Sequence, residues 1–248
     1  MIMARGSRGC FRLGAFEKTI QKKVGRAIGD YRMIKDGDRI LVAVSGGKDS
    51  LILLKLLLER KAFVPVNYDV VAVYVDLGHT IARIAVLKDF IKQLGCPFYI
   101  IRKKVFKKDD DKKLSCFWCS WNRRKILFEA ALKYGCNKIA LGHHKDDIVE
   151  TILMNLLFEG QISAMAPSQE IFKGKITMIR PLAYMEDAQL QKFARLCRIP
   201  AADIACPLGA STKRALVKKF IAKVSKECPG VKTNIFKSLQ RIKKDYLL

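Results

Sequence analysis

The chain has 248 residues, 50% of them hydrophobic, and its 47 Lys and Arg against 23 Asp and Glu give a formal net charge of +24. This length and composition predict one sizeable folded domain with at most a small appendage, and they exclude a chain that is disordered throughout. No run of about 18 apolar residues is free of charge, so we expect no membrane-spanning segment. The basic first residues lack the continuous apolar segment of a secretory signal, and we therefore expect a cytoplasmic protein.

The excess of positive charge favours polyanionic partners, above all nucleic acid. Anionic membrane surfaces and general solubility are the alternative explanations of this charge. Aromatic residues make up only 9% of the chain, and no RNA-recognition or zinc-finger pattern is present. Charge alone therefore does not name the nucleic acid.

The first predicted element is an amphipathic helix over residues 14–31, whose apolar side chains recur at helical spacing. Beyond the turn at residues 36–38, β-branched apolar runs alternate with helical patterns. The predicted strands are residues 40–44, 70–75, 98–101, 138–141 and 177–180, and the predicted helices are residues 50–60, 81–94, 121–134 and 186–198. Strands separated by helices form βαβ units, so the pattern predicts an α/β fold with a doubly wound, mostly parallel five-stranded sheet.

Two charged segments complete the chain. Residues 102–113 are polar and mixed in sign, and they predict a loop that leads into two cysteines. Residues 211–226 combine an apolar stripe with many lysines and arginines, which predicts a basic helix in the C-terminal region. Such a helix suits a solvated surface and a contact with a phosphate backbone equally well.

The segment SGGKDS, residues 45–50, lies between the first predicted strand and the helix that follows it. It differs from the common phosphate loop of nucleotide hydrolases because Asp49, and not Ser or Thr, follows Lys48. Its two glycines let the backbone approach an anion, its two serines add hydroxyl groups, and a helix start offers free N–H groups. The segment therefore predicts a phosphate or pyrophosphate site at the carboxyl end of the sheet, where open sheets bind ligands.

The segment CFWC places the thiols of Cys116 and Cys119 three positions apart, so that both can bind one metal ion or cluster. Iron–sulfur ligation, zinc ligation and a redox or persulfide pair are all consistent with this spacing. A four-cysteine zinc site would need a second such pair, and the sequence has none. Five other cysteines are most simply small buried hydrophobic residues: Cys10, Cys96, Cys136, Cys197 and Cys228.

The segment LGHHKDD, residues 141–147, ends the fourth predicted strand. Gly142 permits close approach of a nucleotide, and the two histidines and two aspartates that follow offer metal binding or proton transfer. Capping of the next helix accounts for one of the two carboxylates, Asp146 or Asp147.

Four segments together resemble the PP-loop ATP pyrophosphatase superfamily, and most closely its tRNA 2-thiocytidine synthetase-like iron–sulfur thiolases. These segments are residues 27–51, 116–131, 141–160 and 179–184, which span most of the chain. SGGKDS alone is specific only to the superfamily, whereas all four segments in this order are specific to the thiolases. The resemblance implies an adenine nucleotide alpha hydrolase-like fold.

By this resemblance, the protein cleaves ATP between its α and β phosphates, adenylates the C2 carbonyl oxygen of a tRNA pyrimidine and replaces that oxygen by sulfur. The pyrimidine is expected to be an anticodon-loop cytidine. The implied cofactors are ATP, Mg²⁺ and a [4Fe-4S] cluster. The residues implied to bind ATP are Val44, Ser45, Gly46, Gly47, Lys48, Asp49, Ser50, Asp76 and Gly142.

The resemblance also implies a catalytic set of Asp49, Asp146 and Arg123, and it gives Arg123 and Arg124 a role in holding tRNA phosphate or the adenylate. The cluster ligands it implies are Cys116, Cys119 and Cys206, which leave one iron open. Cys197 is a poor substitute for the third ligand because it lies within a helical pattern.

The expected partners are tRNA, a sulfur donor such as a cysteine desulfurase or sulfur carrier protein, and a second copy of the chain, without a membrane. We expect an N-terminal basic segment and helix at residues 1–38, the PP-loop domain with the cluster cysteines at 39–210, and a basic helical region packed on it at 211–248. Two alternatives stay open: a PP-loop sulfurtransferase that acts on a tRNA uridine or a small molecule, and a non-enzymatic iron–sulfur RNA-binding protein.

Overall fold

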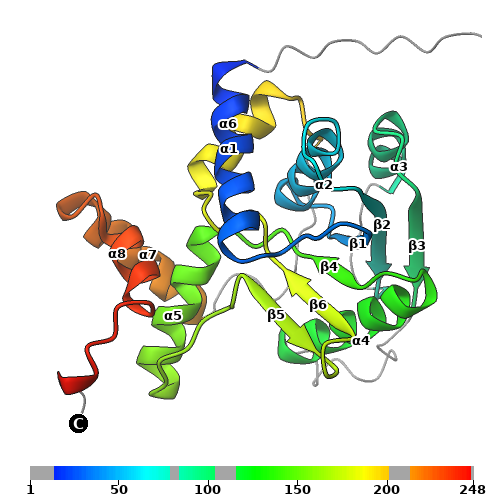
Figure 1. The fold of residues 1–248 in the computed structure, drawn as a ribbon. Helices are drawn as coiled ribbons and strands as arrows, with labels where there is room; N and C mark the ends of the chain where they lie inside the picture. Colours follow the sequence, from blue (N-terminus) through cyan, green and yellow to red (C-terminus); the bar gives the residue numbers. More distant parts are fainter. Residues whose placement is uncertain (1–13, 79–83, 104–115, 201–212, 247–248) are drawn as a thin grey trace, which may run out of the picture.

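The computed structural model describes residues 14–78, 84–103, 116–200 and 213–246, which are built around one six-stranded sheet (Figure 1). The strands are β1 (Asp38–Val44), β2 (Tyr68–Asp76), β3 (Phe98–Arg102), β4 (Lys138–Ala140), β5 (Ser168–Ile171) and β6 (Ile176–Ile179). Their order in the sheet is β3-β2-β1-β4-β6-β5, and every neighbouring pair is parallel except β5 and β6. The predicted α/β class and the five parallel strands are confirmed.

The helices lie between the strands as the sequence predicts. They are α1 (Ala15–Asp30), α2 (Lys48–Arg60), α3 (Ile84–Gln93), α4 (Cys116–Lys133), α5 (Lys145–Glu159), α6 (Asp187–Leu196), α7 (Lys213–Glu227), α8 (Val231–Ser238) and the short 3₁₀ helix η2 (Lys244–Tyr246). Within the described residues, none of these helices has the length and hydropathy needed to cross a bilayer.

Three details differ from the sequence-based expectation. The sheet has a sixth strand, β5, which the pattern did not predict because an edge strand of polar sequence, SQEI, buries little apolar surface. The helix α8 was also not expected. The cysteine pair does not lie in a loop before its helix, because Cys116 begins α4. The predicted loop at residues 102–113 lies for the most part outside the described residues.

Both faces of the sheet are buried. Ile40 and Val42 of β1 pack in a core with α1, α2, α3 and α6, whereas Leu41 packs with α4 on the other face. Figure 1 shows α4 on one side of the sheet and α2 and α3 on the other. Strands that are buried on both faces read as continuous apolar runs, which is why the sequence predicted four of them so clearly.

The C-terminal helices pack on the domain through α5. Figure 1 shows α5 between the sheet and the pair formed by α7 and α8. Val149 and Leu153 of α5 meet Val217 and Ile221 of α7 in a small apolar core. The rest of the predicted apolar stripe of α7 is less covered, because Leu216 and Phe220 are exposed.

The direction in which successive strands are added to the sheet changes once, after β3. The chain builds β1, β2 and β3 outward to one edge and then returns to place β4 on the other side of β1. The gap between the carboxyl ends of β1 and β4 is therefore the topological switch point, where open α/β sheets bind ligands. SGGKDS follows β1 and LGHHKDD follows β4, so both segments lie at this point.

Candidate functional site

The SGGKDS loop closes around its own serines. Ser50 donates a hydrogen bond from Oγ to the carbonyl of Gly47 over 2.9 Å, and the backbone N–H of Ser45 donates to the same Oγ over 3.1 Å. Gly46 has a φ of 88°, a conformation that favours glycine. Gly47 is the N-cap of α2 and makes no side-chain capping bond, so the positive end of this helix faces the site.

A cavity of about 370 Å³, here called the loop cavity, opens at this helix start. It is lined by Ala43, Val44, Ser45, Gly47, Asp49, Ser50, Val75, Ser120, Arg123, Arg124, Leu127, Leu141, Gly142, His143 and Asp147. Four segments far apart in the chain thus meet in one hollow. Val75 lines it, whereas the predicted Asp76 pairs with Arg102 at 4.0 Å and accepts a bond from the backbone of Gly78.

Gly142 is required by the packing of two backbone segments. A Cβ atom at this position would lie 2.9 Å from the backbone nitrogen of Ser50 and 3.1 Å from the carbonyl carbon of Asp49. Real Cβ atoms do not approach backbone this closely. The glycine therefore lets β4 bring its following segment against the start of α2, which shapes the loop cavity.

Three buried polar atoms at the site have no hydrogen-bond partner within the described residues: Nε of Arg123, Nδ1 of His144 and Oδ1 of Asp49, which forms an ion pair with Lys48. Buried polar groups are almost always satisfied, so such exceptions point to a missing ligand. Arg123 comes from α4 and Asp49 from α2, and both side chains line the loop cavity. A cationic donor and an acidic acceptor there suit a nucleotide phosphate with its counter-ion.

A second cavity of about 610 Å³, here called the helix cavity, adjoins the first and shares Asp49 and Asp147 with it. Its walls come from the starts of α2, α5 and α6 and from α7 and α8. Lys48 lies between two acids there, 2.7 Å from Asp187 and 3.0 Å from Asp49. Burial opposes the charged form, but the hydrogen bonds with Asp187 and Asp49 raise the pKa of Lys48.

The two aspartates that begin α5 have different surroundings. Asp147 accepts a 3.0 Å hydrogen bond from the backbone of His144, which caps the helix, and it faces both cavities. Asp146 accepts hydrogen bonds from Lys232 of α8 and from the backbone of Asp187. Burial opposes ionisation, but contacts with His144 and Lys232 hold the pKa of Asp146 well below its ordinary value. Asp146 is thus a tied carboxylate that joins three helices.

His143 faces the loop cavity and is held by Arg180 of the segment IRPLAY. The Nε atom of Arg180 donates to Nδ1 of His143 over 3.4 Å, which leaves the proton of a neutral imidazole on Nε2. Burial lowers the pKa of His143 to about 4, and the positive charge of Arg180 adds to this effect. His143 is therefore neutral at neutral pH and can donate one hydrogen bond.

Asp49, His144 and Asp187 form a cluster whose potential ligand atoms all lie within 4.8 Å of one another. The two carboxylates suit a hard cation such as Mg²⁺, which prefers oxygen ligands. Asp49 and His144 of this cluster each have a buried atom without a hydrogen-bond partner among the described residues, so the residues present fit a divalent cation at the junction of the two cavities.

The cysteine pair lies in the first turn of α4. The chain places Cys119 one turn after Cys116, and the next residue, Ser120, lines the loop cavity. The side chain of Cys116 and all of Cys206 lie outside the described residues. The start of α4 thus brings Cys119 close to the edge of the loop cavity.

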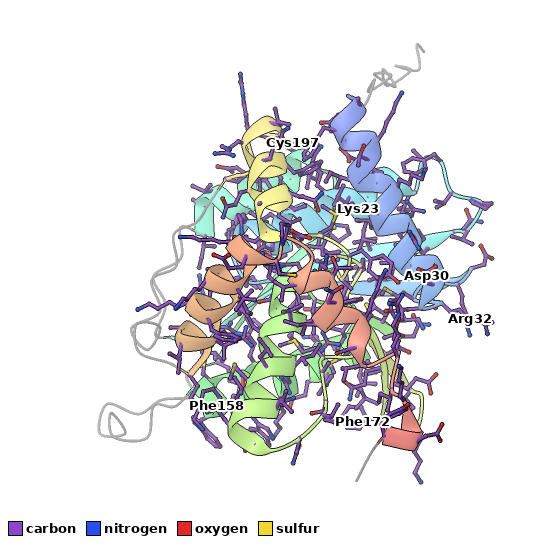
Figure 2. All side chains as sticks on the ribbon, turned by 90° about the vertical axis from the view of Figure 1, so that its left-hand side faces the viewer. Lys23, Asp30, Arg32, Phe158, Phe172 and Cys197 are labelled. Atoms are coloured by element: carbon purple, nitrogen blue, oxygen red, sulfur yellow. The ribbon has the colours of Figure 1, made fainter. Side chains whose placement is uncertain are left out.

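Two of the described cysteines outside α4, Cys96 and Cys197, are poor ligands. Burial raises the pKa of Cys96 to about 11, and burial together with Glu17 raises that of Cys197 to about 12. Figure 2 shows Cys197 at the end of α6. Cys136 is also buried, whereas Cys228 is exposed, which contradicts its prediction as a buried residue. Cys10 lies outside the described residues.

Several site residues were not predicted. Asp187 begins α6 and contacts Lys48, Arg180 holds His143, and Lys232 and Arg214 reach the acids of α5 from α8 and α7. Arg180 stands in a segment that the family resemblance used, so a signal for it existed. Lys232 stands among many similar lysines, and nothing in the local sequence distinguishes it.

Comparison with known proteins agrees with this geometry. The PP-loop domain family matches residues 16–223. The tRNA-cytidine(32) 2-sulfurtransferase of Geobacter sulfurreducens is 39% identical over 237 residues, which cover 93% of this chain and 92% of the relative. The protein of the same name from Burkholderia multivorans is also 39% identical, over 93% of this chain and 71% of the relative. The U34-tRNA thiolase of Methanococcus maripaludis, solved with its [4Fe-4S] cluster, matches with a TM-score of 0.77 at 25% identity and covers 91% of this chain and 78% of its own.

Proposed function

The chain belongs to the PP-loop family of ATP-binding proteins, and on that premise we propose that it is an ATP-dependent tRNA sulfurtransferase that replaces the C2 oxygen of an anticodon-loop cytidine with sulfur. The names of its relatives favour cytidine 32 as the substrate. The match to a U34-tRNA thiolase keeps uridine 34 as the second candidate.

One observation carries the proposal: the SGGKDS loop and the first turns of the cysteine-bearing helix α4 line the same cavity. Ser45 and Ser50 come from the loop, and Ser120 and Arg123 come from α4. An activated base bound at the loop would therefore lie next to the sulfur-handling cysteines. This arrangement gives both the ATP loop and the thiols a role, which neither an ATP-only ligase nor an RNA-binding module would require.

We infer that adenosine occupies the apolar part of the loop cavity, between the strand ends and α4, with its α-phosphate at the start of α2. The N–H groups of that helix start and the guanidinium of Arg123 stabilise the charge that develops on the phosphate. The C2 oxygen of the base attacks phosphorus, and the bond to the bridging oxygen breaks. Pyrophosphate leaves, and the base carries an adenylate at C2.

Charge that develops on the leaving pyrophosphate needs a counter-ion. Asp49 and Asp187 are proposed to hold Mg²⁺ at the junction of the two cavities, and Lys48 between them orients both carboxylates. In the second step, hydrosulfide adds to C2, and AMP departs with the original oxygen. We propose that neutral His143, whose Nδ1 accepts from Arg180, donates a hydrogen bond from Nε2 to that departing oxygen.

The residues proposed to hold the cluster are Cys116, Cys119 and Cys206. A [4Fe-4S] cluster with three protein ligands supplies an iron that can bind inorganic sulfide. The position of Cys119 supports this assignment of the cluster ligands, because the next residue, Ser120, lines the loop cavity. The high pKa of Cys197 argues against it as a substitute ligand.

The remaining partners follow from this chemistry. Sulfide must come from a donor such as a cysteine desulfurase or a sulfur carrier protein. Because the substrate is tRNA, we propose that the reaction takes place in the cytoplasm. A homodimer is proposed by analogy with the family alone.

The decisive experiment is mass spectrometry of tRNA nucleosides from cells with and without the protein. Loss of 2-thiocytidine is expected, whereas loss of a thiouridine would move the substrate to position 34, and no loss would refute both. In purified protein, tRNA-dependent pyrophosphate release should disappear in Ser50→Ala. Iron content and the EPR signal should be lost in Cys119→Ser and kept in Cys197→Ser, since Cys197 stays a protonated thiol.

A further inference from the structure

A third hollow lies outside the two cavities, between α4 and the β5–β6 hairpin. This hairpin groove has a volume of about 850 Å³. It is lined by Trp121, Arg124, Lys125, Phe128, Glu129, Leu132, Gln169, Ile171, Phe172, Lys175, Ile176 and Met178. Its lining contains both aromatic and cationic side chains. Of these residues, only Arg124 also lines the loop cavity, and the others have no part in the chemistry described above.

Two of the three aromatic side chains that line the groove, Trp121 and Phe172, are exposed, and Trp118 adjoins Trp121. Trp118 and Trp121 lie one helical turn apart on α4, and their rings stack with centroids 5.6 Å apart and planes inclined by 10°. They are 42% and 47% exposed. Lys125 lies over the Trp121 ring at 5.8 Å, a cation–π contact. Large aromatic residues this exposed, in a hollow rimmed by cations, mark a binding surface.

The other side of the groove carries a strained aromatic residue. Phe172 at the turn of the hairpin has a φ of 53°, and the next residue, Lys173, has a φ of 56°. Both values lie in the left-handed region, which tight hairpin turns usually fill with Asn or Gly, and a bulky residue there is an outlier. Phe172 meets Phe128 edge to face at 5.2 Å and is 53% exposed (labelled in Figure 2). Strain that keeps an aromatic ring exposed suggests a function for that ring.

The charges around the groove select an anionic partner. Arg124, Lys125 and Lys175 are exposed along it. Among the described lining residues, Glu129 is the one acid, and it pairs with Lys103 at 3.4 Å. Arg124, Lys125 and Lys175 form no ion pair within the described residues. Stacking rings flanked by cations are the means by which proteins bind single-stranded nucleic acid.

Arg124 lines both the hairpin groove and the loop cavity, so the two hollows meet at this residue. We propose that the hairpin groove binds the unpaired nucleotides of the tRNA anticodon loop, whose bases stack on Trp121 and Phe172 while Arg124, Lys125 and Lys175 bind phosphates. A neighbouring nucleotide, turned out of the loop, then passes Arg124 into the loop cavity. The inference rests on the proposed function in taking tRNA as the substrate, and it adds the surface that presents the base.

The two tryptophans of the chain are Trp118 and Trp121, so tryptophan emission reports on this surface alone. An anticodon stem-loop RNA should quench this emission on binding, and a fully paired RNA of the same length should quench it much less. The titration uses the full chain without ATP or a sulfur source, so its result does not depend on thiolation. Anisotropy of a labelled stem-loop gives the affinity independently of the emission.

Removal of one stacking ring should weaken stem-loop binding by about tenfold, as expected for loss of one base stack. The variants are Trp121→Leu and Phe172→Ser, and Trp121→Tyr should restore most of the affinity. Phe63→Ser is the matched control, because Phe63 is 53% exposed like Phe172 and makes a cation–π contact with Arg60, but it lies just after α2 and outside the groove. Lys125→Gln with Lys175→Gln should flatten the salt dependence of binding. Circular dichroism checks that each variant is folded.

Unchanged emission at saturating RNA would overturn the proposal, as would wild-type affinity in both ring variants. A response to a sulfur-donor protein and not to RNA would also overturn it and assign the groove to that donor. If the ring variants bind RNA weakly while the wild type thiolates no tRNA, the proposed function fails and the groove stands. If the ring variants bind normally while the wild type thiolates tRNA, only the groove proposal fails.

Discussion

The Nζ atom of Lys48 lies 2.7 Å from Oδ1 of Asp187, which ties the phosphate loop after β1 to the start of α6, 139 positions later in the chain. The same ammonium group lies 3.0 Å from Asp49. Lys48 is therefore already engaged by two carboxylates before any phosphate binds. We propose that Lys48 holds these acids together as well as contacting the nucleotide, and that Asp187 therefore belongs to the site.

Asp187→Asn is expected to raise the Mg²⁺ concentration for half-maximal pyrophosphate release by about tenfold or more, because it removes one charged oxygen from the Asp49–Asp187 pair. The KM for ATP at saturating Mg²⁺ should change less. Initial rates across a Mg²⁺ series measure both. Glu186→Gln is the control, since Glu186 stands one position earlier and pairs with Lys145. Equal Mg²⁺ dependence in the wild type and Asp187→Asn would contradict the assignment.

Gly142→Ala is expected to weaken ATP binding by at least about tenfold and to lower the free energy of unfolding by about 1–3 kcal/mol, the usual cost of overpacking. The added Cβ would lie 2.9 Å from the backbone of Ser50, so the start of α2 must shift. Calorimetric titration and urea unfolding measure the two effects.

Gly29→Ala serves as the control for this change. Gly29 lies in α1, and an added Cβ there meets no atom within 4 Å. Alanine should stabilise that helix by about 0.5–1 kcal/mol. If Gly142→Ala behaved like Gly29→Ala, the close approach of the two backbone segments would not constrain the site.

Asp146 and Lys232 are expected to act as one unit. A double-mutant cycle with Asp146→Asn and Lys232→Gln should give a coupling of about 0.5–3 kcal/mol in the free energy of unfolding, because the two groups are hydrogen-bonded in a partly buried place. Both variants should loosen α8, which hydrogen exchange would show as faster amide exchange there.

The same variants test whether Asp146 has a structural or a catalytic role. If Asp146 acts by fastening α8, then Asp146→Asn and Lys232→Gln should lower kcat to the same extent, and their combination should add nothing. Asp147→Asn should have the larger effect on kcat, since Asp147 faces both cavities. A loss of kcat in Asp146→Asn that Lys232→Gln does not share would instead give Asp146 a direct role.

The pKa of His143 predicts how stability depends on pH. The folded-state value is about 4, below the ordinary value of 6.5, so between these pH values the unfolded chain binds a proton that the folded chain does not. His143 therefore lowers the free energy of unfolding as the pH falls from about 6.5 to about 4. His143→Gln should flatten the pH dependence of the urea midpoint in that window.

Arg180→Gln should raise the pKa of His143 part of the way toward its ordinary value, because burial would remain as the largest cause of the shift. NMR titration of the imidazole signals measures this, with His143→Gln assigning the resonance. Titration of His143 near its ordinary value in the wild-type protein would show that burial and Arg180 do not control it.

The sequence by itself determined the alternation of strands and helices. Strands buried on both faces appear in it as continuous apolar runs, and amphipathic helices appear as apolar residues at helical spacing. It also determined the phosphate loop, since glycines, serines and a helix start suffice for anion binding within six adjacent residues. The edge strand β5 and the helix α8 carried no such signal, because each buries little apolar surface of its own.

Only the tertiary structure decided which distant residues complete the site. Asp187, Arg180 and Lys232 lie far along the chain from the groups they hold, and their positions depend on how α6, β6 and α8 pack, which no local pattern encodes. The structure also distinguished the surroundings of Asp146 from those of Asp147. Adjacent residues of a helix point in different directions around its axis, so the two carboxylates meet different partners. Finally, it brought Phe172, whose backbone is strained, and Trp121 into the lining of one groove, which only the packing of the hairpin beside α4 creates.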